Sequence, residues 1–321
     1  MTKEQLKIVF FGTPEFAVGS LRRLADGGFN IAGVVTMPDK PAGRGKHLLQ
    51  SDVKRFALER GLNVLQPANL KDEAFVADLR ALDADLFIVI AFRMLPEVVW
   101  AMPRLGTFNL HASLLPKYRG AAPINWAVIN GETQTGVTTF FLKHEIDTGD
   151  IIQQKKIDIA PDENVGSVHD RLMELGASMV VETVEDIIAG KVATVSQDKL
   201  IAEGQSTTPA PKINKETCHI SWNRPAQEVY NLIRGMSPYP AAWSVLTDDD
   251  GQQWQTKIYE ARLCPAATSS PGTVSVDGKR MTVQCADAPI EIVSLQMAGK
   301  RRMGAQEFLR GLRYNGQLYF K

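Results

Sequence analysis

Short apolar runs alternate with longer stretches of mixed polarity through the first 190 residues of the chain. The run DLFIVIAF at 85–92 is almost wholly apolar, which is typical of a strand covered on both faces of a parallel sheet. Strands that alternate with helices in this way predict an α/β fold with a doubly wound, mostly parallel sheet. The expected strands are 6–12, 30–36, 63–66, 85–92, 106–115, 135–145 and 149–159, and the expected helices are 14–26, 51–60, 72–82, 121–129 and 165–189.

The junction between the first strand and the first helix carries turn and capping signals. Gly12 ends the apolar run, Thr13 can cap the helix with its hydroxyl, and Pro14 suits the first helical position. The segment FGTPEF lacks the GxGxxG spacing, so it gives little support to a dinucleotide site. Gly12 indicates a tight strand-to-helix turn instead.

The pattern changes after Gly190. Residues 191–216 combine Pro, Ser, Thr and Lys, which predicts a linker. Short apolar runs separated by Gly and Asp-Gly turns then predict a small β-barrel of the oligonucleotide-binding type. We therefore expect a catalytic domain at 1–190, a linker at 191–216 and a C-terminal β-barrel domain at 217–321. The barrel elements expected are helices at 225–236 and 304–313 and strands at 241–246, 255–263, 272–276, 281–285 and 290–297.

Composition and charge describe an ordinary globular protein. The length of 321 residues suggests two domains, and 44% of the residues are hydrophobic. The formal net charge is zero, so no global field marks a polyanionic partner. Residues 1–206 carry 22 basic and 26 acidic side chains, whereas residues 207–321 carry 14 and 10. This asymmetry is a weak hint of an anionic partner, and ordinary scatter of surface charge explains it equally well.

The cysteines and the N-terminal residues bear on the compartment. Cys218, Cys264 and Cys285 are widely spaced and form neither a CxxC nor a zinc pattern, which fits a reducing environment. The segment MTKEQLKIVFFG has no apolar signal region, and the longest apolar run, at 86–92, is far too short to cross a membrane. We expect a cytoplasmic protein without membrane segments, and a monomer.

One later strand carries the candidate chemistry. Asn109, His111 and Ser113 alternate in FNLHASLLP, so a strand places their side chains on one face. A solvated strand edge produces the same pattern. However, EIDTGDII also places Asp147 and Asp150 in a Gly-containing turn after another strand. Sites in open α/β sheets lie at the carboxyl ends of strands, where these groups would meet.

An Asn, a His and an Asp together suit acyl transfer to an amine. A charged imidazole and a neutral amide can both donate to a developing oxyanion, and a carboxylate can orient the imidazole or accept a proton from the amine. The sequence has no GxSxG elbow and no HExxH pattern, so we expect neither a serine hydrolase nor a metal site.

The motifs FNLHASLLPKYRGAAPI and TGVTTFFLKHEIDTGDII resemble those of the formyltransferases that use 10-formyltetrahydrofolate. The family signature is Asn, then His two residues later, then SLLP, with a distant Asp in a DTGD turn. This resemblance implies that Asn109, His111 and Asp147 are catalytic. It also implies that the SLLP segment, Ser113, Leu114, Leu115 and Pro116, binds the folate, without a metal.

Further segments resemble the branch of that family whose acceptor is initiator methionyl-tRNA. These segments are IVFFGTPEFA, PDKPAGRGK and SWNRPAQEVYNLIRGMSPYPAAW, so the resemblance covers essentially the whole chain. It implies that the loop around Arg44 reaches the acceptor end of the tRNA and that the C-terminal barrel holds the acceptor arm. One segment departs from the family pattern: AFRMLP is one residue short and has Arg93 where Gly is usual. Ile90 and Phe92 beside it are still expected to line the folate pocket.

The basic segments allow two interpretations each. KPAGRGKH, with Lys40, Arg44 and Lys46, is either an exposed loop or a basic finger that contacts phosphates and stacks on unpaired bases. Lys117 and Arg119 either form a solvated turn or face substrate phosphates, and the resemblance favours the second. AGKRRM, with Arg301, is either a tRNA-contacting loop or a solvated hairpin. We expect the three aromatic residues Trp222, Trp243 and Tyr239 to form barrel core.

Other functions remain open at this stage. The same fold formylates glycinamide ribonucleotide, usually in shorter single-domain chains, or amino-sugar nucleotides, commonly with a different C-terminal partner. An RNA-binding protein that lost the activity is a rival from another class, which the intact Asn-His-Asp set argues against. An enzyme that passes the formyl group to water needs the same three residues, so the sequence separates it poorly.

Overall fold

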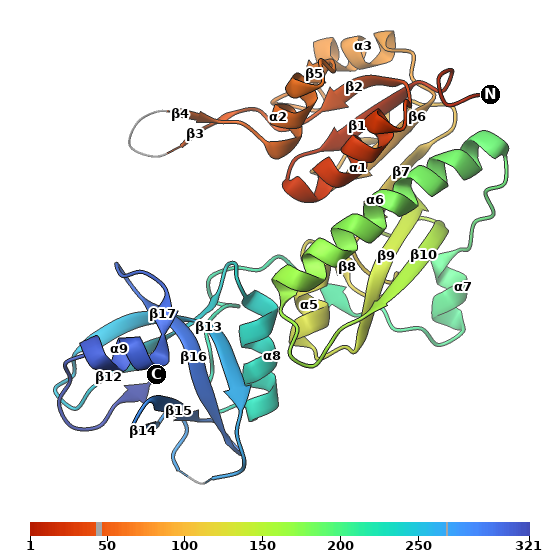
Figure 1. Ribbon diagram of the computed structural model, residues 1–321. Helices are drawn as coiled ribbons and strands as arrows, with labels where there is room; N and C mark the ends of the chain where they lie inside the picture. The colour runs from red at the N-terminus through yellow and green to blue at the C-terminus, as the bar shows by residue number, and fades with distance from the viewer. Residues whose placement is uncertain (43–46, 268) are drawn as a thin grey trace. The chain divides into compact units, whose positions relative to one another are not determined.

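The computed structural model describes residues 1–42, 47–267 and 269–321. Two compact units make up the chain (Figure 1). The first comprises 1–123, 135–157 and 169–210, and the second comprises 124–134, 158–168 and 211–321. The predicted tRNA-binding residues Arg44 and Lys46 lie outside the described residues.

A seven-stranded sheet forms the centre of the first unit, in the order β10-β9-β7-β6-β1-β2-β5. The neighbours from β7 to β5 run parallel, and β9 is antiparallel to β7. The predicted doubly wound, mostly parallel α/β sheet is therefore confirmed. The strands are β1 (Ile8–Gly12), β2 (Ile31–Val35), β5 (Val64–Leu65), β6 (Leu86–Ile90), β7 (Thr107–His111), β9 (Gln134–Phe141) and β10 (Ile151–Asp158). The helices are α1 (Glu15–Asp26), α2 (Asp52–Glu59), α3 (Glu73–Ala81), α4 (Glu97–Trp100), α6 (Val165–Ala189) and α7 (Gln197–Ala202).

The central strands are apolar throughout because helices cover both faces of the sheet. Every residue of β1 and β6 is buried. Side chains at odd positions, such as Phe11 and Phe87, pack in one cluster with Leu79 of α3 and Val99 of α4. On β7, Leu110 lies directly against Gly176 of α6, where an added Cβ would approach the leucine to 2.7 Å. The helix can therefore pack close to the strand that carries the candidate site.

Two local predictions in this unit need revision. Pro14 is the N-cap of α1, and the buried Thr13 hydroxyl has no hydrogen-bond partner, so the predicted Thr13 cap is wrong. The segment around KPAGRGKH, expected to be a loop, contains two antiparallel three-residue strands, β3 (Lys40–Ala42) and β4 (His47–Leu49). Strands this short leave no clear alternation in the sequence.

The segment expected to link the domains has structure of its own. It contains α7 and the short strand β11 (Pro209–Ala210), which pairs with β8 (Arg119–Gly120). An added Cβ at Gly120 would lie 2.5 Å from the Ala210 carbonyl oxygen, so glycine allows this close approach. Residues up to Ala210 belong to the first unit.

An antiparallel sheet curls around the core of the second unit. Its order is β14-β15-β16-β13-β12-β18, and β17 pairs with β16. The predicted barrel-like C-terminal fold is confirmed. The elements are α5 (Pro123–Ile129), α8 (Ala226–Met236), α9 (Ala305–Gly311), β12 (Ala242–Thr247), β13 (Gln253–Leu263), β14 (Val274–Asp277), β15 (Arg280–Gln284), β16 (Pro289–Met297), β17 (Met303–Gly304) and β18 (Tyr319–Phe320).

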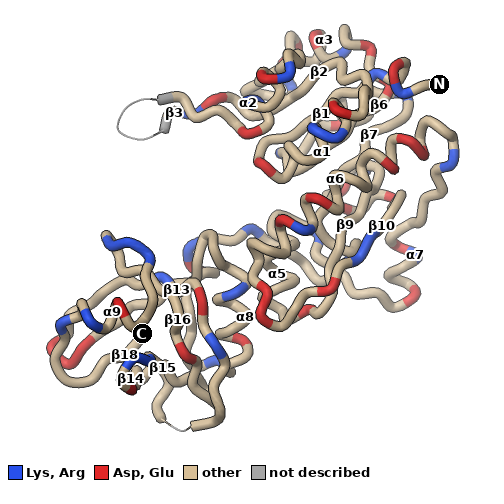
Figure 2. The backbone as a smooth tube through the Cα atoms, viewed as in Figure 1, with Lys and Arg blue, Asp and Glu red and all other residues tan. Residues whose placement is uncertain are grey.

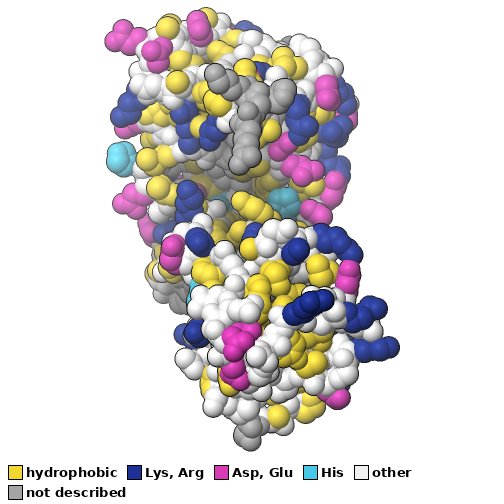
Figure 3. Space-filling view, turned by 90° about the vertical axis from the view of Figure 1, so that its left-hand side faces the viewer, with side chains coloured by type: hydrophobic (Ala, Val, Ile, Leu, Met, Phe, Trp, Pro, Cys, Tyr) yellow, Lys and Arg dark blue, Asp and Glu magenta, His cyan; other side chains and the backbone are white. Residues whose placement is uncertain are grey.

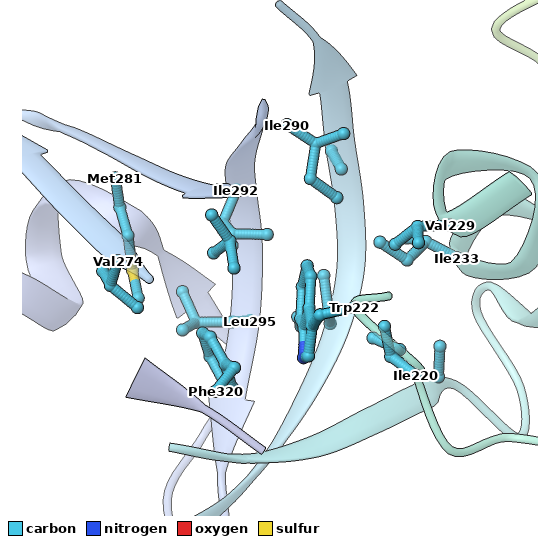
Figure 4. Packing of buried hydrophobic residues seen from close by; sticks show 14 of the residues in the cluster. Ile220, Trp222, Val229, Ile233, Val274, Met281, Ile290, Ile292, Leu295 and Phe320 are labelled. Carbon is cyan, nitrogen blue, oxygen red and sulfur yellow. The ribbon is translucent and has the colours of Figure 1, made fainter. Parts of the chain in front are cut away.

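Trp222 lies at the centre of the apolar core of this unit (Figure 4). Its ring stacks on Phe320 at 5.3 Å between centroids, and its indole Nε1 donates to the Ser244 hydroxyl at 3.0 Å. Trp243 is partly buried against the same core. Tyr239 was predicted to be core but is 82% exposed, so that prediction is wrong. The segment SPYP holds it outside, between Pro238 and Pro240.

Over the ranges that the structure describes, no helix is long and apolar enough to cross a bilayer. Among the same residues, no group of three His, Cys, Asp or Glu side chains is arranged to hold a metal ion.

Candidate active site

Two of the predicted catalytic residues, Asn109 and His111, lie on the carboxyl-terminal half of β7, inside the first unit. β7 runs between β6 and β9, and Asn109 pairs with Val89 on one side and Phe140 on the other. Asn109 and His111 are two residues apart on this strand, so both side chains lie on one face of the sheet. Asn109 is half-buried and His111 is buried. The strand backbone thus sets the spacing of the two groups.

Both nitrogens of the His111 imidazole have a polar neighbour. Nε2 lies 2.8 Å from the carbonyl oxygen of Tyr118. A carbonyl can only accept, so Nε2 carries a hydrogen and donates it. Nδ1 faces the Asp147 carboxylate, with 3.9 Å between Nδ1 and Oδ2. When Nδ1 is also protonated, the positive ring has a carboxylate beside it in a buried setting, where charge pairing is screened less than at the surface.

The SLLP segment forms a fixed turn directly after β7. The Ser113 hydroxyl donates to the Lys117 carbonyl at 2.7 Å, so this side chain closes the turn rather than pointing to open space. The Leu115 backbone N–H donates to the Thr138 hydroxyl at 3.2 Å. Gln154 of β10 donates to the Leu115 carbonyl at 2.8 Å. These bonds fix the Tyr118 carbonyl that orients His111.

Asp147 occupies a strained turn between β9 and β10. Its φ of 56° lies in the left-handed region, which a residue with a Cβ seldom adopts. The carboxylate Oδ2 accepts the backbone N–H of Gly120 at 2.9 Å, two residues beyond Tyr118. At Gly149, an added Cβ would overlap the carbonyl oxygen of Phe141, so the turn requires glycine there. Asp150 points elsewhere and pairs with Lys143 at 2.8 Å.

The residues predicted to line the folate pocket differ in exposure. Ile90 is fully buried, with Gly12 and Leu110 beside it in the sheet. Phe92 is half-buried and meets Phe11 edge-on, so it retains some surface. Of the SLLP segment, Leu114 is half-buried while Ser113, Leu115 and Pro116 are buried. Phe92 and Leu114 therefore present more surface to a ligand than the others.

The structure also shows what Arg93 does in place of the usual Gly. Its guanidinium donates to the carbonyls of Pro67 and Ala68, the latter at 2.8 Å, and lies over the Phe92 ring. Burial lowers the pKa of this guanidinium. The atypical segment 91–96 is thus anchored to the chain that follows β5, and it leads into α4.

One residue near the site, Gln197, was missed by sequence reasoning. Gln197, the first residue of α7, is fully buried and binds the turn that carries Asp147. Arg119, which the resemblance predicted to face substrate phosphates, donates to Gln197 through Nε and Nη2. No local signal marks Gln197, because its segment resembles a linker and its partners lie 48 to 78 residues away.

The described residues predicted to bind tRNA lie at exposed positions. Lys40 opens the β3–β4 hairpin. The basic stretch Lys300–Arg302 forms the turn between β16 and β17 (Figure 2), and Arg301 pairs there with Glu307. Lys and Arg side chains gather near exposed hydrophobic ones on the surface of the second unit (Figure 3). Such mixed surfaces suit a phosphate backbone with unpaired bases.

Two family models match the chain. One of the formyl transferase family matches residues 6–184, and one of the formyl transferase C-terminal domain matches residues 212–313. The methionyl-tRNA formyltransferase of Bacteroides fragilis is 57% identical over 313 residues, covering 97% of this chain and 96% of that protein. Those of Bacteroides thetaiotaomicron and Flavobacterium johnsoniae are 58% and 51% identical, each covering 98% of both chains.

Solved structures show the same fold at low sequence identity. An N-formyltransferase from Helicobacter canadensis, in complex with folinic acid and dTDP-3-aminofucose, matches with a TM-score of 0.64 at 20% identity, covering 91% of this chain and 100% of that one. HypX from Aquifex aeolicus, in complex with tetrahydrofolic acid, matches with a TM-score of 0.61 at 17% identity, covering 96% of this chain and 48% of that one. The resemblance carried by FNLHASLLP and DTGD is confirmed: the chain belongs to the formyl transferase family.

Proposed function

We propose that the chain transfers the formyl group of 10-formyltetrahydrofolate to the free α-amine of initiator methionyl-tRNA. The product is N-formylmethionyl-tRNA for translation initiation. Relatives named methionyl-tRNA formyltransferase, 50–58% identical over nearly the whole chain, support this substrate pair. The juxtaposition of His111 with Asp147 beside Asn109 is the observation that carries the chemistry.

The reaction begins when the amine nitrogen attacks the formyl carbon. A tetrahedral intermediate forms, and the former carbonyl oxygen becomes an oxyanion. The Asn109 amide and the charged His111 ring stabilise this oxyanion by donating to it. Since Nε2 is committed to Tyr118, Nδ1 is the nitrogen through which His111 meets the reaction. The bond from carbon to N10 then breaks, the amine loses a proton and N10 gains one.

Asp147 has two tasks in this scheme. Its negative charge lies beside Nδ1 of the ring, and it accepts the proton that the attacking amine releases, directly or through water. The Gly120 N–H fixes Oδ2 for both tasks. The folate lies against Phe92 and the SLLP segment, where Leu114 retains surface.

We assign binding of the acceptor tRNA to the basic segments. Arg44 and Lys46, with Lys40 at the hairpin base, contact the acceptor end of the tRNA, and Arg301 contacts its phosphates. The enzyme acts in the cytoplasm. It is a monomer, and sedimentation velocity tests this oligomeric state. The amino-sugar N-formyltransferase structure shares about one fifth of its residues with this chain, so the match shows a shared fold and does not support an amino-sugar substrate.

Transfer of label from 10-formyltetrahydrofolate to three acceptors tests the function. Initiator methionyl-tRNA, elongator methionyl-tRNA and glycinamide ribonucleotide are offered side by side. We expect the label on the initiator tRNA. We also expect Arg44→Ala to raise the KM for this tRNA. Label on the small amine, or free formate without a tRNA product, overturns the substrate assignment.

A further inference from the structure

Gln197 is a fully buried polar side chain whose hydrogen-bonding capacity is fully used. Its amide Nε2 donates one hydrogen to the carbonyl of Asp147 at 2.9 Å and the other to the carbonyl of Gly149 at 2.8 Å. Its Oε1 accepts from Nε and Nη2 of Arg119, at 3.0 and 2.7 Å. Both donors and both acceptor positions of the amide are therefore occupied.

These bonds join the two turns that hold the proposed catalytic pair. Arg119 lies between Tyr118, whose carbonyl orients His111, and Gly120, whose N–H binds the Asp147 carboxylate. Gln197 closes the ring from the other side, because it grips the backbone of Asp147 itself. The distance between the imidazole and the carboxylate is thus fixed through the amide of Gln197.

The rest of the segment presents Gln197 rigidly. Val195 exchanges two backbone hydrogen bonds with Ile151, at 2.8 and 2.9 Å, at the start of β10. Leu200 of α7 packs against the apolar cluster formed by Leu115, Phe140 and Ile151. The backbone of Thr208 accepts from the Tyr118 N–H at 2.5 Å. Residues 195–210 therefore support both turns of the site.

The Asp147 turn needs such support. Asp147 holds a left-handed φ, which costs conformational energy and persists only where the surroundings determine it. The bonds from Gln197 to the carbonyls of Asp147 and Gly149 supply that constraint. An apolar side chain in its place would leave two buried carbonyls and the Arg119 guanidinium unpaired.

We infer that Gln197 is a positioning residue that holds Asp147 in register with His111, so that residues 195–210 are part of the formyl-transfer machinery. This inference rests on the proposed role of Asp147. Gln197 touches no reacting atom, and it acts by keeping the carboxylate within reach of Nδ1.

A double-mutant cycle tests the inference on the full-length protein. The variants are Gln197→Met, Gln197→Glu, Asp147→Ala and the double variant Asp147→Ala/Gln197→Met. Gln153→Met is the control, because Gln153 of β10 is a half-buried glutamine that donates to Asp186 at 2.6 Å, away from the site. Formyl transfer is measured as kcat and KM, with thermal unfolding to check the fold.

We expect Gln197→Met to lower kcat by about 10- to 100-fold, as for a misplaced catalytic group, with KM for 10-formyltetrahydrofolate nearly unchanged. Gln197→Glu keeps the size and the bond to Arg119 but turns an oxygen toward two carbonyls, so it also lowers kcat. In the Asp147→Ala background, Gln197→Met should have almost no further effect on rate, because the group it positions is gone. Gln153→Met should leave kcat unchanged.

Three results would overturn the inference. One is a Gln197→Glu variant that folds and keeps the wild-type kcat. Another is an equal loss of kcat from Gln197→Met with and without Asp147, which indicates general stabilisation. The third is an Asp147→Ala variant with the wild-type rate, which would refute the proposed catalytic role of Asp147 itself. The single variants thus distinguish failure of this inference from failure of the proposed function.

Discussion

The two units use buried polar groups in opposite ways. In the first, Gln197, His111 and Asp147 are held mainly by backbone carbonyls and N–H groups at the carboxyl end of a sheet. In the second, apolar side chains surround Trp222, and one hydroxyl satisfies its indole (Figure 4). Hydrogen bonds specify direction and distance, whereas apolar packing supplies free energy of unfolding without fixing one orientation. Substitutions at this site in the first unit should change rates, and those in the apolar core of the second unit should change stability.

The largest expected effect is on the stability of the second unit. Trp222→Ala removes a buried ring from the barrel core and should lower the free energy of unfolding by about 3–5 kcal/mol. Calorimetry of the full chain measures it. Tyr239→Ala is the control, because that ring is 82% exposed and its loss should change stability by less than about 0.5 kcal/mol. Equal destabilisation by both variants would contradict the assignment of the core.

The next effect is on rate alone. His111→Ala removes an oxyanion donor and should lower the rate of formyl transfer by about 10²–10³-fold. Its thermal unfolding should change far less than that of Trp222→Ala. His169→Ala on α6 is the control, since its ring contacts Phe16 and Asp170 away from the site. A His111→Ala enzyme within a few-fold of the wild-type rate would exclude the assigned role.

A smaller effect is expected on tRNA binding by the second unit. Arg301→Ala should weaken methionyl-tRNA binding by less than about tenfold and reduce the slope of log affinity against log salt by about 1, as for one lost phosphate contact. The kcat should stay constant. Filter binding from low to high salt measures the slope, and an unchanged slope would place Arg301 outside the interface.

The smallest effect tests a polar anchor in the first unit that lies apart from the chemistry. Hydrogen bonds from Lys54 and then Gln66, at 2.6 and 2.8 Å, lower the pKa of Asp39 at the base of the β3–β4 hairpin. A carboxylate whose pKa is lowered in the folded state stabilises that state at pH values above the ordinary carboxyl pKa of about 3.9. This contribution is lost as the pH falls through the pKa of the folded state.

Asp39→Asn should therefore reduce stability at pH 7 and have a smaller effect as the pH falls below about 4. Denaturant titrations at both pH values measure the difference. Asp83→Asn is the matched control, because that carboxylate is 88% exposed and pairs only with Lys7 among the ion pairs of the described chain. If the loss of stability caused by Asp39→Asn grew on acidification, it would contradict the predicted direction of the pH dependence.

Much of the fold follows from the sequence because apolar runs such as LFIVI leave few alternatives to a covered strand. The trio Asn109, His111 and Asp147 could be found because their residue types and motifs are distinctive. Gln197 could not, since its role depends on pairing with residues far away in the chain. The predicted Thr13 cap was wrong because the helix starts one residue later than expected, at Glu15, so that Pro14 takes the N-cap position. Tyr239 shows that aromatic residues in the same stretch of sequence, here with Trp222 and Trp243, need not all pack in the same core.

The proposed chemistry is tested most directly by comparing Asp147→Asn with Asp147→Ala in single-turnover formyl transfer to initiator methionyl-tRNA, at saturating substrates. The Asn side chain can still accept the Gly120 N–H, but it places no negative charge beside the His111 ring and is a poor proton acceptor. We expect both variants to lose most of the rate, by about 10²-fold or more for a charged group that acts in the transition state. An Asp147→Asn enzyme with the wild-type rate would contradict the proposed chemistry, because the carboxylate would then serve only to anchor the turn.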